Sequence, residues 1–87
     1  MDEASPFMRD WALKWLRGSI ESYIRGNTPI NIVKGRIRKA VKSYGTSIEE
    51  IEALINSILH DPLINVPGEL LSERVKPLIA FIRELKG

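Results

Sequence analysis

Apolar residues recur at helical spacing along this chain, and Gly or Pro residues separate the apolar stretches from one another. The clearest stretch begins at Thr28-Pro29, a cap residue followed by proline, and ends at Gly45. Its apolar residues follow the period of 3.6 that gives a helix one buried face: Ile30, Val33, Ile37, Ala40, Val41 and Tyr44. No stretch alternates in polarity for long enough to predict a strand. The chain is therefore predicted to be all-α.

Start and stop signals divide the chain into four helices, at about 6–25, 29–44, 47–60 and 68–86. A Ser-Pro pair opens the first helix, and Gly26 follows its end. In the first helix the expected core residues are Met8, Ala12, Trp15, Leu16, Ile20, Tyr23 and Ile24. In the third they are Ile48, Ile51, Leu54, Ile55, Ile58 and Leu59. Each helix thus has one face to bury against the others.

The third helix opens with a capping box, in which Ser47 and Glu50 satisfy each other's backbone N–H groups. The apolar segment 63–68 is bounded by prolines, which predicts an extended connection. The last helix contains Pro77, yet its apolar phase continues across it, through Leu71, Val75, Leu78, Ile82 and Leu85. This phase favours one kinked helix, although a break at Pro77 stays open.

Size and composition limit what such a fold can do. The 87 residues make a single domain, 1–87, with one modest core and no deep cleft, so we expect a compact four-helix bundle with short connections. There is no Cys, no signal-peptide pattern and no membrane-length apolar run, from which we expect a cytoplasmic protein. Gln is absent while Ile occurs twelve times, a balance that favours a thermophilic source.

The usual catalytic arrangements are missing from the sequence. His60 is the sole histidine, and its position at a helix end favours contact with the terminal carbonyls over metal binding. Glu49, Glu50 and Glu52 form an acidic cluster, but acids in a first helical turn are accounted for by the helix dipole. No phosphate-binding loop or nucleophile elbow occurs. We therefore expect neither an enzyme nor a bound metal or cofactor.

The strongest asymmetry is one of charge. Residues 28–45 carry five basic side chains and no acid, namely Lys34, Arg36, Arg38, Lys39 and Lys42. Residues 46–61 carry four acids and neither Lys nor Arg. The basic block is either a surface that contacts nucleic-acid phosphates or a solvated face neutralised by the acids that follow. Both interpretations stay open.

Helical spacing arranges the basic side chains in two groups. Lys34, Arg38 and Lys42 recur every four residues along one flank, whereas Arg36 and Lys39 are expected on the outer face with Ile32 and Gly35. A glycine inside a helix costs roughly 1 kcal/mol relative to Ala, so Gly35 indicates close approach by another backbone or a phosphate. Apart from the arginines, only Asn31 is suited to reading base edges, so any binding should be largely independent of sequence.

Three aromatic side chains, Phe7, Trp11 and Trp15, step four residues at a time along the edge of the apolar face of the first helix. With Ile32 and Gly35 they are candidates for partner binding, because marginal aromatics often anchor interfaces. The alternative is that they pack against the fourth helix. Homodimerisation through this edge is compatible with either function considered below. A membrane-surface role is disfavoured, because Asp10 and Glu21 offset most of the positive charge on the opposite face of this helix.

Two functions follow as hypotheses. The first is a non-catalytic accessory subunit that docks on a larger protein, such as a polymerase, primase or repair assembly. The second is an autonomous DNA- or RNA-binding protein that uses the basic helix. The accessory role is favoured by small size, missing chemistry and marginal aromatics beside a basic helix.

Overall fold

The computed structural model describes the backbone of residues 6–87 and the side chains of residues 8–87. Its four α-helices are α1 (Pro6–Ile24), α2 (Ile30–Ser43), α3 (Ile48–Leu59) and α4 (Gly68–Lys86), and a short 3-10 helix, η1 (Pro62–Ile64), precedes α4. The described residues contain no strand. The prediction of an all-α fold with short connections is confirmed.

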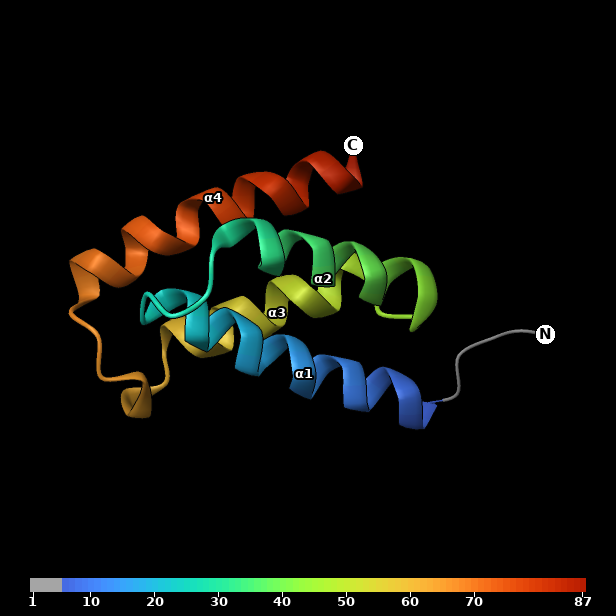
Figure 1. Ribbon diagram of the computed structural model, residues 1–87, viewed down its shortest axis with the longest axis horizontal. Coiled ribbons are helices and arrows are strands. Elements are labelled where there is room, and N and C mark those ends of the chain that lie inside the picture. The colour runs from blue at the N-terminus through green and yellow to red at the C-terminus, as the bar shows by residue number, and fades with distance from the viewer. Residues whose placement is uncertain (1–5) are drawn as a thin grey trace.

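Successive helices run in opposite directions, and α1 packs against both α2 and α3, while α3 packs against α4 (Figure 1). Gly26 and Gly45 end α1 and α2 with φ angles of 86° and 75°, a backbone region that glycine adopts without steric cost. None of the helices within residues 6–87 is both long and apolar enough to cross a bilayer.

The core lies between the apolar faces of all four helices, as the periodicity predicts for α1, α2 and α3. On α4 the prediction needs one correction. Phe81 is only 6% exposed and belongs to the core, whereas Leu85, expected there, is 38% exposed. The two residues lie one turn apart, and α2 covers the first of them, because Lys34 and Arg38 lie over the Phe81 ring.

The two helix starts that the sequence marks differ in outcome. The capping box of α3 is confirmed, since Ser47 Oγ accepts from Glu50 N at 3.1 Å and Glu50 Oε1 accepts from Ser47 N at 2.9 Å. At α2 the cap prediction is wrong, because Pro29 occupies the cap position without a side-chain hydrogen bond. The Thr28 hydroxyl instead lies 2.7 Å from Ser22 Oγ at the end of α1. The Ser-Pro start of α1 lies outside the described side chains.

Helix α4 is continuous through Pro77, which confirms one helix rather than two. The connection before it is not extended throughout, because Pro62–Ile64 forms η1, with Asp61 Oδ1 accepting from Leu63 N at 2.9 Å. Arg17 of α1 donates to Asp61 Oδ2 at 2.7 Å and also contacts Glu21 at 3.0 Å. These bonds hold the end of α3 and the start of η1 against α1.

Candidate nucleic-acid interface

The exposed arc of α2 carries most of the basic side chains that the sequence singled out. Arg38, Lys39 and Lys42 are exposed, and Lys34 is half-buried. Within residues 8–87, none of these four cations lies within 4.0 Å of a carboxylate oxygen. Their charge is therefore not neutralised by a direct ion pair.

Lys34 and Arg38 follow the flank of α2 that faces α4. Lys34 Nζ lies 5.4 Å and Arg38 Cζ 5.0 Å from the centroid of the Phe81 ring. Such cation-π contacts restrain the two side chains while leaving their charge uncompensated. Two members of the predicted stripe, Lys34 and Arg38, therefore lie together over one aromatic ring of α4.

Arg36 does not lie on the outer face, where the spacing predicts it. Its Nη1 donates to the buried Ser19 Oγ at 2.7 Å, and its guanidinium lies 5.6 Å from the centroid of the Trp15 ring. The side chain is half-buried against α1 because both of these partners lie on that helix. Arg36 thus packs against α1, whereas Lys34 and Arg38 lie against α4.

The acids of α3, considered as neutralising partners for α2, have other partners. Glu49 and Glu52 lie 3.6 Å and 4.0 Å from Lys86 Nζ at the end of α4. Glu50 Oε2 lies 3.5 Å from Arg9 Nε, besides its role in the capping box. These three acids therefore pair with cations of α1 and α4, and not with the basic side chains of α2 across the turn.

Two small or apolar residues share the exposed arc of α2 with the cations. Ile32 is exposed, as expected. A Cβ atom built on Gly35 would meet nothing within 4 Å, so no other helix among the described residues approaches Gly35 closely. The close approach that its sequence position indicates would have to come from a ligand or partner.

The aromatic edge of α1 packs against α2 rather than against α4. Trp11 and Trp15 stack with their ring centroids 5.5 Å apart and an interplanar angle of 15°. Tyr44 meets both rings edge-on, at 5.6 Å and 5.9 Å. Trp11 keeps 44% of its surface exposed beside the end of α2. The Phe7 side chain lies outside the described residues.

A second exposed apolar group lies around η1 and was missed from the sequence. Leu63 is 82% and Leu70 is 42% exposed, and both line one open depression with Val66 and Pro67. The extended connection that the sequence predicts for 63–68 does not indicate that Leu63 is exposed. The η1 turn instead directs it outward, a result that periodicity does not reveal for a short segment between prolines.

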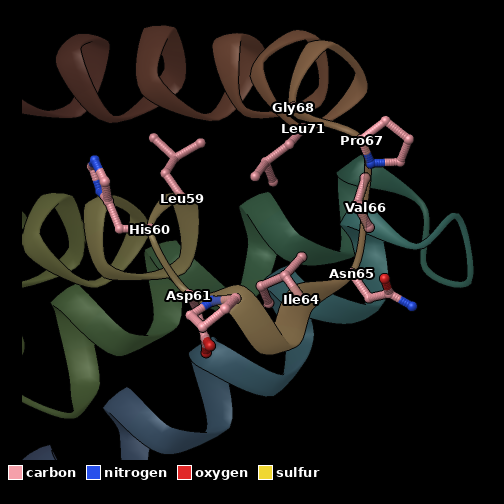
Figure 2. A pocket seen from close by; sticks show the side chains of 10 residues that line it. Leu59, His60, Asp61, Ile64, Asn65, Val66, Pro67, Gly68 and Leu71 are labelled. Atoms are coloured by element: carbon pink, nitrogen blue, oxygen red, sulfur yellow. The ribbon is translucent and has the colours of Figure 1, made fainter.

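A neighbouring depression separates the end of α3 from the start of α4 and contains the sole histidine (Figure 2). His60 Nδ1 lies 2.9 Å from the Asn56 carbonyl oxygen, which agrees with the helix-end role expected of it. Asp61 points to another side and is bonded to Arg17 and to the Leu63 N–H. The depression thus holds no pair of titratable groups aimed at one point.

Metal-binding side chains do not cluster in the described part of the chain, where no three His, Cys, Asp or Glu residues come together. Among residues 8–87, Tyr23 has a shifted pKa. Burial raises its pKa above the ordinary value of 10.0, and the positive charge of Arg74 partly opposes that rise. Tyr23 Oη donates to the Arg74 carbonyl oxygen at 2.8 Å, so this group joins α1 to α4.

Comparison with known proteins identifies no relative. No protein-family model, curated protein sequence or solved structure matches this chain.

Proposed function

We propose that this protein binds the phosphate backbone of nucleic acid through the exposed arc of α2. The observation that carries the proposal is the set of four cations without carboxylate partners on one helix, within residues 8–87: Lys34, Arg38, Lys39 and Lys42. Desolvated phosphate oxygens are strong acceptors for such groups, and every phosphate neutralised releases counterions.

The side chains on this arc support binding without sequence preference. Lysines contact phosphates as point charges, and α2 offers little else that could read a base edge besides Arg38 and Asn31. Gly35 leaves open space on the same arc, where a phosphate can come close to the helix backbone. The protein acts in this proposal as a non-catalytic binder.

The test is fluorescence anisotropy of labelled DNA at about 50 and 200 mM salt. Four phosphate contacts predict that affinity falls roughly 100-fold over this range, because each contributes about 0.9 to the slope of log affinity against log salt. Absence of binding at 50 mM salt would contradict the proposal.

A second candidate function is docking on a larger protein of the nucleic-acid machinery, as an accessory subunit. It is favoured by Leu63 and Leu70, which expose apolar surface around one depression on elements other than α2. Affinity capture from the source extract, with wild type and Leu63→Asp compared side by side, tests it. The expected result is a protein retained by the wild type and lost from the variant; equal capture by both counts against it.

A further inference from the structure

The basic surface of α2 and the exposed tryptophan edge of α1 lie next to each other near the C-terminal end of α2. Helix α1 runs antiparallel to α2, so that Arg36 lies beside Ser19 and Tyr44 lies beside Trp11. Lys39 follows Arg36 by three residues, so it lies on the same side of α2 and one turn nearer the C-terminal end of that helix. The exposed Trp11 ring, which stacks on the Trp15 ring beside Arg36, thus lies on the Lys39 side of the basic surface of α2.

The Trp11 ring is held in place before any ligand arrives. It stacks on Trp15 and meets the edge of Tyr44, and Trp15 in turn has the Arg36 guanidinium beside its ring. Arg36 is itself restrained by its 2.7 Å hydrogen bond to Ser19. A ring restrained in this way loses little conformational entropy when another flat group stacks on it.

Resting on the proposed function, we propose that the ligand is single-stranded nucleic acid, with phosphates on the basic arc of α2 and an unpaired base stacked against Trp11. Aromatic side chains beside a basic surface are the means by which proteins hold single strands, since every base has a face that can stack. In a duplex these faces are covered by the neighbouring base pairs.

The charges near Trp11 on α1 do not favour a phosphate at this position. Asp10 and Lys14 flank Trp11, are both exposed and carry opposite charges, so together they give no net attraction for a phosphate. Lys39 and Lys42 are exposed on α2. The backbone of the strand accordingly follows α2, and the base reaches toward α1.

The test compares labelled oligothymidine with a duplex of the same length, by anisotropy, on wild type, Trp11→Ala, Trp11→Phe and Leu85→Ala. Loss of one stacked base lowers single-strand affinity about 5- to 100-fold in Trp11→Ala, with duplex affinity unchanged. Trp11→Phe keeps a stacking ring and most of the affinity. Leu85→Ala removes a side chain of similar exposure, 38%, from α4 and leaves both affinities unchanged.

A second readout does not depend on the stability of Trp11→Ala. Of the two tryptophans, Trp11 alone remains in Trp15→Phe, so oligothymidine that stacks on it quenches the fluorescence of that variant. Wild-type binding with no quenching, and with equal single-strand affinity in Trp11→Ala, overturns this inference and leaves the α2 proposal standing. A wild type that binds neither nucleic acid overturns both.

Discussion

Arg36 on α2 donates a hydrogen bond to the buried Ser19 hydroxyl of α1, over 2.7 Å. Ser19 Oγ in turn donates to the Trp15 carbonyl oxygen at 3.0 Å, and Trp15 is the ring beside which the guanidinium lies. One cation of the basic helix is therefore part of the packing between α1 and α2. The other four have no carboxylate partner within residues 8–87, so substitutions can test the two groups of cations separately.

Arg36→Gln is expected to lower the free energy of unfolding by about 1–2 kcal/mol, because it removes a charge-assisted hydrogen bond and a cation-π contact. Lys39→Gln is the matched control, since Lys39 is exposed and should change stability by less than about 0.5 kcal/mol. Urea denaturation measures both. Equal stability of the two variants would show that the Arg36 contacts contribute nothing to the fold.

Gly35→Ala is expected to stabilise the protein by about 0.5–1 kcal/mol, because alanine favours the helix and its Cβ meets no other atom within 4 Å. Gly18→Ala is the control on α1, where the added Cβ also has open space. Thermal denaturation checks that both variants gain stability.

Binding then distinguishes these two glycines. If a phosphate approaches the backbone at Gly35, the added methyl group weakens DNA binding severalfold in Gly35→Ala while Gly18→Ala binds like the wild type. Unchanged affinity in both variants would mean that the space at Gly35 is not used by the ligand.

The raised pKa of the Tyr23 hydroxyl predicts that the protein loses stability at alkaline pH. Burial raises its pKa, so above the unfolded value of 10.0 the unfolded chain loses this proton while the folded chain retains it. The unfolded state then binds fewer protons, and the stability that Tyr23 contributes is lost as pH rises from 10.0 through the folded pKa. Urea denaturation across this pH range is expected to show a smaller loss in Tyr23→Phe than in the wild type.

A direct titration can be made on Tyr44→Phe, in which Tyr23 is the only tyrosine. Its tyrosinate absorbance should appear at higher pH in the folded than in the urea-unfolded protein. Coincident curves would contradict the account of its burial against Arg74.

Much of the fold could be predicted because burial follows helical periodicity wherever a partner helix is present. The faces of α1 to α3 and the capping box at Ser47 are local patterns, and they are confirmed. Leu85 continues the apolar phase of α4 but is exposed, while Phe81, off that phase, faces the flank of α2. Which neighbour lies beside a helix is a tertiary fact that spacing along one helix does not contain.

The candidate site could likewise be predicted only in part, because spacing along α2 does not show which residues of other helices lie beside it. Spacing placed Lys39 on the solvent side and gave Lys34 and Arg38 a common flank, as the structure has them. It placed Arg36 on the outer face as well, because nothing in α2 alone indicates that Ser19 and Trp15 lie beside it. The exposure of Leu63 depends on η1, a turn of three residues that has no periodic pattern.

The most direct test of the central claim is DNA affinity in two triple variants of equal charge. One replaces Arg38, Lys39 and Lys42 by Gln, and the other replaces Lys14, Lys76 and Arg83. All six are exposed and, within residues 8–87, form no ion pair, so both variants lower the net charge by three. The account predicts that the α2 variant loses binding and about two to three units of salt slope, whereas the other stays close to wild type. Equal losses in the two variants would contradict it, because binding would then depend on net charge and not on the surface of α2.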